Sequence, residues 1–246
     1  MPTRRTVLAG ISALPVLAAI RPAFAQSSDA LATSAGELTI HPVQHASLAL
    51  KLGDTVLYID PAEADFSALP APTGILITHA HGDHYNAEAL EKLAAGGIPL
   101  IVNEDVFSKL PESLKVQATA LANGASGEIA GIPVAAVPAY NTTADRLQYH
   151  PEGVGNGYVL SFGDQQVYVA GDTEDVPEMR ALTNIAIAFL PMNLPYTMDV
   201  EQAADAVKAF RPTIVYPYHF GDSDTARFAE LVGNASEVRM ANWYPG

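Results

Sequence analysis

Four side chains able to bind a metal ion lie within six consecutive residues of this sequence. They are His79, His81, Asp83 and His84, in a chain that holds only seven histidines. Alternate residues of an extended segment point the same way, so His79 and His81 can hold one ion from one side. Gly82 permits a sharp turn, after which Asp83 and His84 face a neighbouring position. Because imidazole and carboxylate groups suit zinc, iron and manganese alike, the pattern predicts a transition-metal centre rather than a solvated helix cap.

The composition narrows the chemistry further. The chain contains no cysteine, which excludes thiolate ligands and leaves His, Asp and Glu to build the metal site. A serine nucleophile motif of the form Gly-x-Ser-x-Gly is also absent. The 27 acidic side chains outnumber the 13 basic ones, which gives a formal net charge of −14. Since nucleic-acid binding needs Lys and Arg to displace counterions, we expect a small-molecule substrate and no nucleic-acid partner.

The first 25 residues have the layout of an export signal. Arg4 and Arg5 precede the apolar stretch 7–20, which is short for a membrane span, and Ala23-Phe24-Ala25 offers small residues to a signal peptidase. We expect a cleaved signal peptide over residues 1–25, of the twin-arginine type. An ordinary signal peptide and an uncleaved anchor are the alternatives. We therefore expect a periplasmic or secreted protein with no stable membrane anchor after cleavage.

The rest of the chain predicts one layered α/β domain. Residues 26–36 are small and polar and predict a flexible linker, so the domain is expected over 37–246. Asp199 and Gln202 are spaced as a helix capping box. Strands interspersed with helices, several of the strands apolar on both faces, indicate sheets covered by helices. The expected strands are Glu37–Ile40, Ser47–Leu52, Val56–Ile59, Ile75–Thr78, Leu100–Val102, Val134–Val137, Tyr158–Phe162, Gln166–Ala170, Ala186–Leu190 and Ile214–Tyr216, and the expected helices are Asn86–Ala95, Pro177–Leu182, Val200–Phe210 and Asp224–Val232.

The motif His-x-His-x-Asp-His after a buried strand resembles the signature of the metallo-β-lactamase superfamily. Residues 166–173 are similar to the family's strand that ends in Gly-Asp, here Gly171-Asp172, and residues 214–221 resemble the strand that ends in its last histidine ligand, here His219. The resemblance covers most of 37–246. It implies an αβ/βα four-layer sandwich of two mixed β-sheets flanked by helices. His45-Ala46-Ser47 and Tyr58-Ile59-Asp60-Pro61 resemble the ascorbate-phosphate-lactonase-like branch.

The chain departs from the common family pattern at one ligand. The family often carries a histidine directly after the strand that corresponds to 133–139, where this chain has Tyr140 and Asn141. His150 is the only histidine left in that interval, and a loop from Asn141 to Gly157 would have to fold back to deliver it. We predict that His150 is the missing ligand. A surface position for His150, with only two histidines at the first metal, is the alternative.

The resemblance implies a complete dinuclear centre. The first ion would take His79, His81 and His150, the second would take Asp83, His84 and His219, and Asp172 would bridge them with a water. Two divalent ions, zinc first with manganese or iron as alternatives, would turn this water into a hydroxide that attacks the substrate. The expected function is metal-dependent hydrolysis of a small ester, lactone or phosphodiester, with Asp83 and Asp172 as catalytic residues. The alternatives are an exported β-lactamase-type enzyme, a non-catalytic periplasmic metal-binding protein and, as a minor reading, iron redox chemistry.

Three further residues are candidates for supporting roles. Asp60 ends an apolar run and is expected to accept hydrogen bonds from the metal loop or from a ligand imidazole. His45 is expected to be structural, with contact to a ligand or to substrate as the alternative. Tyr196 lies in a loop expected to line the substrate, where its hydroxyl could stabilise an oxyanion, while packing at a strand end is the competing explanation.

Overall fold

The computed structural model describes residues 1, 29–62 and 64–245. The predicted signal peptide, Met1 apart, and residues 26–28 of the predicted linker lie outside the described residues. Within the described part of the chain, no helix is long and apolar enough to cross a membrane.

Two seven-stranded mixed sheets form the centre of the domain. In each sheet the first strands pair antiparallel and the later ones pair parallel. The strands follow one another across each sheet in chain order, so both halves are wound alike. The first sheet contains β1 (Asp29–Thr33), β2 (Gly36–Gln44), β3 (Ser47–Leu52), β4 (Thr55–Ile59), β5 (Gly74–Leu76), β6 (Leu100–Val102) and β7 (Ala118–Ala120), and the second contains β8 (Ser126–Ile129), β9 (Ile132–Ala139), β10 (Gly155–Phe162), β11 (Gln165–Val169), β12 (Ile185–Pro191), β13 (Ile214–Tyr218) and β14 (Glu237–Val238).

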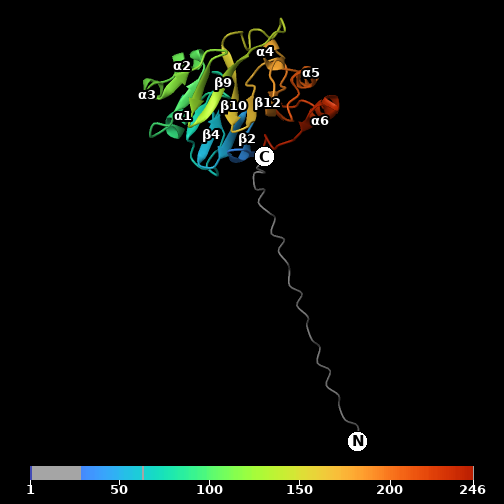
Figure 1. Cartoon of the computed structure of the whole chain (residues 1–246), viewed down its shortest axis with the longest axis horizontal. Coiled ribbons are helices and arrows are strands. Elements are labelled where there is room, and N and C mark those ends of the chain that lie inside the picture. The colour runs from blue at the N-terminus through green and yellow to red at the C-terminus, as the bar shows by residue number, and fades with distance from the viewer. Residues whose placement is uncertain (2–28, 63, 246) are drawn as a thin grey trace.

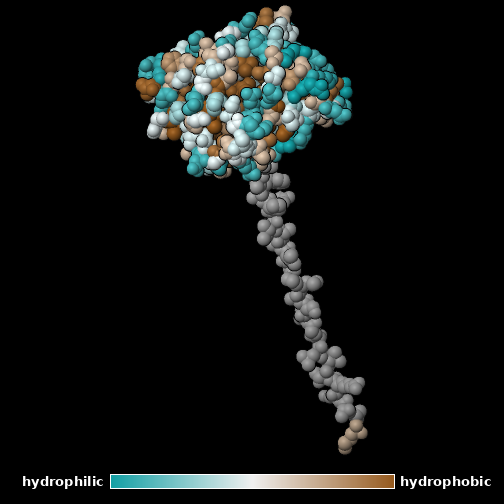
Figure 2. All heavy atoms as spheres, in the orientation of Figure 1, coloured by the Kyte–Doolittle hydropathy of each residue, from teal (hydrophilic) through white to brown (hydrophobic). Residues whose placement is uncertain are grey.

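Helices cover the outer face of each sheet, which confirms the predicted four-layer αβ/βα sandwich (Figure 1). One core cluster joins the inner faces of the two sheets, and two others join each sheet to its own helices. Figure 2 shows hydrophilic residues over the outer side of the second helical layer and hydrophobic ones toward the middle of the same face. The first sheet is covered by α1 (Ala87–Leu93), α2 (Glu104–Lys109) and α3 (Glu112–Lys115), and the second by α4 (Pro177–Arg180), α5 (Val200–Phe210) and α6 (Thr225–Val232).

Local signals in the sequence fix several of these elements. Helix α5 begins with the predicted capping box, in which the Asp199 carboxylate accepts from the Gln202 amide and the Gln202 side chain binds back to the Asp199 amide. Gly53 and Gly163 sit at positive φ in the turns between antiparallel strand pairs, where the sequence places hairpins.

The flexible linker predicted over 26–36 is wrong from Asp29 onward. Asp29 to Thr33 form β1, which pairs antiparallel with β2, and Leu31 packs against the core between the sheets. The Asp29 carboxylate accepts from the Tyr216 hydroxyl, and from the Arg239 guanidinium at 2.6 Å. These partners come from the far end of the chain, so local composition carries no sign of them.

Candidate metal centre

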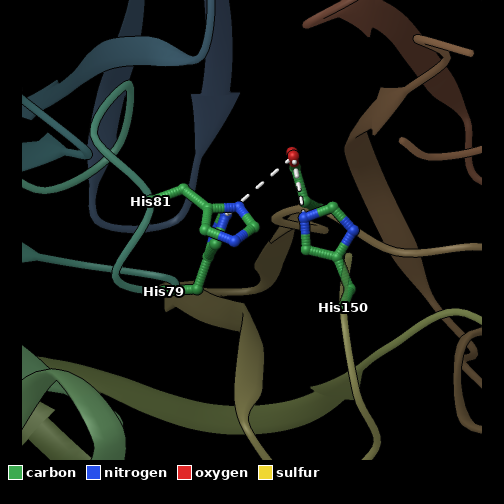
Figure 3. A group of neighbouring side chains, drawn as sticks. His79, His81 and His150 are labelled. Atoms are coloured by element: carbon green, nitrogen blue, oxygen red, sulfur yellow. Dashed lines mark hydrogen bonds and ion pairs between the residues drawn. The ribbon is translucent and has the colours of Figure 1, made fainter. Parts of the chain in front are cut away.

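The first cluster brings together the histidine motif and His150. Metal-binding atoms of His79, His81, His150 and Asp172 all lie within 4.8 Å of one another. His79 Nε2 is 3.0 Å from His81 Nδ1, and His150 Nε2 is 3.3 Å from the Asp172 carboxylate. Figure 3 shows the imidazoles of His79, His81 and His150 close together, delivered by two separate segments of the chain. The loop between β9 and β10 therefore places His150 where the sequence predicts a ligand.

A second cluster adjoins the first and shares Asp172 with it. Atoms of His84, Asp172 and His219 meet the same 4.8 Å limit. His84 Nε2 lies 3.4 Å from one Asp172 oxygen, and His219 Nε2 lies 3.5 Å from the other. Asp83 borders this cluster, with its Oδ2 3.1 Å from His219 Nε2 and 3.7 Å from His84 Nε2. Asp172 thus stands between two groups of histidines.

Strand ends of both sheets deliver these side chains to one edge of the sandwich. His79 follows β5 of the first sheet, while Asp172 and His219 follow β11 and β13 of the second. Gly171 precedes Asp172 with a φ of +66°, and a Cβ there would lie 2.9 Å from the Asn156 carbonyl oxygen. Only glycine fits this turn without displacing the neighbouring backbone, which explains the Gly-Asp pair.

Polar atoms inside both clusters lack partners, and a cation would satisfy them. His84 Nε2, His150 Nε2 and Asp172 Oδ1 are buried without a hydrogen-bond partner among the described residues. Each buried polar atom without a partner lowers the free energy of unfolding by about 1–3 kcal/mol. Three such atoms in one place therefore destabilise the fold unless a ligand binds there. The donor set of imidazole nitrogens and carboxylate oxygens suits Zn²⁺, Mn²⁺ and Fe²⁺. The residues therefore fit a divalent metal ion.

The pKa shifts agree with a site built for positive charge. Burial, followed by the neighbouring His84, holds the pKa of His79 well below its usual range, so His79 is neutral and able to bind a metal. Burial would raise the pKa of Asp172, but His219 and His84 outweigh it and lower that pKa well below its usual range. Burial would lower the pKa of His84, whereas the Asp172 and Asp60 carboxylates raise it to about 9. The negative charge of these carboxylates, which stabilises the proton on His84, would also stabilise a bound metal ion.

Comparison with known proteins identifies the family. The model of the beta-lactamase superfamily domain matches residues 39–219, which is most of the chain. The chain belongs to the metallo-β-lactamase superfamily. A UPF0173 metal-dependent hydrolase of Nitratidesulfovibrio vulgaris is 32% identical over 224 residues, covering 82% of this chain and 90% of the relative. Another from Pyrococcus horikoshii is 32% identical over 173 residues, covering 67% and 76%.

Solved structures agree with this assignment. A protein from Parabacteroides distasonis, provisionally described as a metal-dependent hydrolase, aligns with a TM-score of 0.83 and 40% identity, over 89% of this chain and all of that one. A metallo hydrolase from Ignicoccus hospitalis aligns with a TM-score of 0.70 and 26% identity, over 82% and 94%. This member of the superfamily is therefore a metal-dependent hydrolase, and its candidate His and Asp ligands occupy one site.

Asp60 holds the outer nitrogens of the ligand histidines, as the sequence predicts. Its carboxylate accepts from the Thr78 amide and hydroxyl at 2.7 Å each, and from His84 Nδ1 at 2.8 Å. Because the Thr78 hydroxyl gives its proton to Asp60, it accepts from His79 Nδ1, 3.0 Å away. Both histidines are thereby fixed with Nε2 free to face the cluster.

Replacing Asp60 by asparagine is expected to weaken metal binding without dismantling the fold. Asparagine can still accept from Thr78, but it removes the charge that holds the His84 imidazole. Loss of such an outer partner lowers metal affinity by about tenfold to a hundredfold. Metal titration with a competing chelator measures this change. Asp54→Asn, in the exposed turn between β3 and β4, is the matched control, and an affinity of Asp60→Asn equal to that of the control would contradict the role.

His45 lies beside the second cluster, which favours the alternative over a purely structural role. Its Nε2 is 3.3 Å from Asp83 Oδ2, and its ring centre is 3.9 Å from that of His219. Its Nδ1 is 3.0 Å from the Tyr244 hydroxyl, which also accepts from the Gly221 amide. Sequence reasoning missed Tyr244, because nothing near the chain end marks it as close to a turn two hundred residues earlier.

Tyr196 contributes its backbone rather than its hydroxyl. Its carbonyl oxygen accepts from His150 Nδ1 at 3.0 Å and from the Asn141 amide group at 2.7 Å. The Tyr196 side chain is 45% exposed and meets the ring of Tyr149 edge-on, at 5.0 Å between centres. Tyr196 therefore orients His150, whereas no contact brings its hydroxyl to the described ligands.

Glu174 anchors the loop that carries His150 and was not identified from the sequence. This fully buried carboxylate accepts from the amides of Thr142 and Thr143 at 2.7 and 2.6 Å, and from Arg146 at 2.6 Å. Burial would raise its pKa, but these hydrogen bonds outweigh burial and lower that pKa. Its position two residues after Asp172 is the only signal in the sequence. Glu174 thus binds both the backbone and the arginine of this loop.

Replacing Glu174 by glutamine is expected to loosen this loop. The partly buried Arg146 would lose its ionic partner, the buried Glu174 carboxylate, which costs about 3 kcal/mol of unfolding free energy. Because the pKa of Glu174 is lowered, its stabilisation is complete above the ordinary glutamate pKa and is lost as the pH falls through the folded value. Chemical denaturation at neutral and acidic pH measures both effects. The difference in unfolding free energy between the unchanged protein and Glu174→Gln should shrink toward acidic pH. A difference that stays constant with pH would contradict stabilisation by the ionised Glu174 carboxylate.

Proposed function

We propose that this metal-dependent hydrolase binds two divalent ions, zinc first, and cleaves a small ester, lactone or phosphodiester. The observation that carries the proposal is the position of Asp172, whose two carboxylate oxygens face different histidine groups. His79, His81 and His150 would hold one ion, and His84, His219 and Asp83 the other. When bound, the ions would lower the pKa of a water molecule toward neutrality and stabilise the negative charge that develops on the substrate.

The chain's own residues would orient the reactants. Asp83 is partly exposed at the mouth of the site, and hydrogen bonds from His219 and His45 outweigh burial and hold its pKa below the usual range. An ionised carboxylate accepts hydrogen bonds, which suits the orientation of a nucleophilic water. Asp60 would keep His79 and His84 in place while this happens.

Export of the chain is part of the same proposal. The layout of residues 1–25 supports a periplasmic or secreted location, where the enzyme would meet its small-molecule substrate. Comparison of the mature N-terminus with residue 26, by mass spectrometry of the exported protein, tests this point. A chain that keeps residues 1–25 after fractionation would contradict the cleaved signal.

A substrate panel tests the catalytic proposal. The metal-loaded protein would be assayed with a carboxylic ester, a lactone, a phosphodiester, a thioester and a β-lactam, before and after chelation. The proposal expects turnover of an ester, lactone or phosphodiester that chelation abolishes and added zinc restores. Turnover of the β-lactam alone would favour a β-lactamase, and no turnover by fully loaded protein would favour a metal-binding protein without catalysis.

A further inference from the structure

Apolar side chains project from the two loops that hold His150. Leu147 and Tyr149 belong to the loop between β9 and β10, and Leu194 and Tyr196 to the loop between β12 and α5. Leu147 and Leu194 are each 47% exposed, and Tyr196 is 45% exposed. These four residues are called the apolar rim below. Exposed leucines on neighbouring loops beside a polar centre mark an interaction site more often than a lone exposed leucine does.

Hydrogen bonds tie the apolar rim to the metal centre. The Tyr196 carbonyl accepts from His150 Nδ1, and the Asn141 amide group donates both to that carbonyl and to the Arg146 carbonyl, at 2.7 and 3.0 Å. Arg146 in turn donates to the Thr197 carbonyl at 3.2 Å. The two loops therefore form one unit with a ligand histidine, so a group bound on the rim has a fixed position relative to that histidine.

The same region offers little to an anionic substrate. The cavity beside the first cluster, about 220 Å³ in volume, is lined by one cation, Lys109, whose Nζ is 2.6 Å from Asp105. The described residues that line the cavity beside the second cluster, of about 270 Å³, include Asp83 and no lysine or arginine. Arg146 is bound to the buried Glu174. Among the described residues that line these two cavities, a phosphodiester would therefore find no unpaired arginine or lysine, the usual side-chain partners of phosphate, and would depend on the metal ions alone for positive charge.

We infer that the substrate is a neutral carboxylic ester or lactone bearing an apolar chain, and that this chain lies on the apolar rim. The inference rests on the proposed function and narrows its substrate class. Burial of each methylene group contributes about fourfold in affinity, so chain length is the property that the rim would select. The carbonyl group of such a substrate is uncharged and needs no lysine or arginine as a partner, which agrees with the lack of unpaired cationic side chains among the described residues of the two cavities.

The first experiment measures turnover along a chain-length series. Zinc-loaded protein would be assayed with p-nitrophenyl acetate, butyrate and hexanoate and with bis-p-nitrophenyl phosphate. We expect kcat/KM to rise by about threefold per methylene group and the phosphodiester to be the poorest substrate. In the double variant Leu147→Ser/Leu194→Ser the rise of kcat/KM with chain length should flatten. Val116→Ser, which changes an 87% exposed apolar residue outside the two loops of the apolar rim, is the matched control and should keep the full rise.

A second experiment needs no turnover. Calorimetry would compare the binding of cyclopentanone with that of 2-pentylcyclopentanone, a neutral analogue of an alkyl lactone that cannot be hydrolysed. We expect the pentyl group to strengthen binding by at least about tenfold, and the double variant, but not Val116→Ser, to lose most of this gain. If no ester is cleaved but the pentyl group still strengthens ketone binding, the proposed function is wrong while the assignment of the apolar rim as a binding surface is supported. Equal binding of both ketones, or a phosphodiester cleaved faster than hexanoate, would overturn the inference.

Discussion

The variant Asp172→Asn is expected to lose both metal ions and at least about a hundredfold in turnover. Replacing a residue that only hydrogen-bonds to a metal ligand already lowers metal affinity by about tenfold to a hundredfold, and Asp172 is itself a candidate ligand. Asp172 is buried and its two oxygens face different clusters, so its charge serves both metal positions at once. Asparagine keeps the shape of the side chain but removes the negative charge that offsets two divalent ions. Elemental analysis after dialysis against micromolar zinc, together with kcat/KM on a cleaved ester, measures the change.

The control for this variant is again Asp54→Asn, which should keep its metals and its turnover. Circular dichroism should show a folded Asp172→Asn protein, because the surrounding strands do not depend on the carboxylate. Two metals per chain in folded Asp172→Asn would show that the two positions do not share this residue.

The variant His150→Ala is expected to reduce the metal content from two ions per chain to one. His150 reaches the first cluster only through its loop, and His79 and His81 would be left as the histidine ligands there. Loss of His150 leaves two histidines and a carboxylate that the second ion would share, which is one ligand fewer than in the original set, so zinc should bind more weakly at this position. Turnover should fall by about a hundredfold, as expected when the ligand set of a catalytic metal is disrupted.

His41→Ala is the matched control for this second prediction. His41 is partly buried in β2, and its ring contacts Thr39 at 3.1 Å, outside every candidate metal cluster of the described residues. Metal content after dialysis should therefore stay at two ions in His41→Ala. Recovery of two ions from His150→Ala as well would show that another group completes the first position.

The sequence predicts the parts of the site that follow from strand ends. His79, Asp172 and His219 each close an apolar run, and parallel strands bring such ends to one edge of a sheet. The expected strands and helices that bury continuous apolar residues are present in the fold for the same reason. Short elements such as β7, β8 and α3 were missed, because three or four residues carry too little periodicity to identify.

The remaining features depend on contacts between distant segments. The flexible linker predicted at 26–36 contains β1, because Asp29 meets Tyr216 and Arg239, which local composition does not reveal. Tyr244 reaches His45 through the packing of the chain end, and Glu174 holds a loop whose sequence looks merely polar. Such residues are identified only once the two sheets are packed face to face.

Anomalous X-ray diffraction from crystals of the zinc-loaded protein would locate the metal ions themselves. We expect two zinc peaks per chain, one contacted by His79, His81 and His150 and the other by His84 and His219, with Asp172 between them. The expected separation is about 3.5–4 Å, as in two-metal hydrolases. A fully loaded crystal with a single zinc peak, or with peaks away from Asp172, would contradict the dinuclear centre.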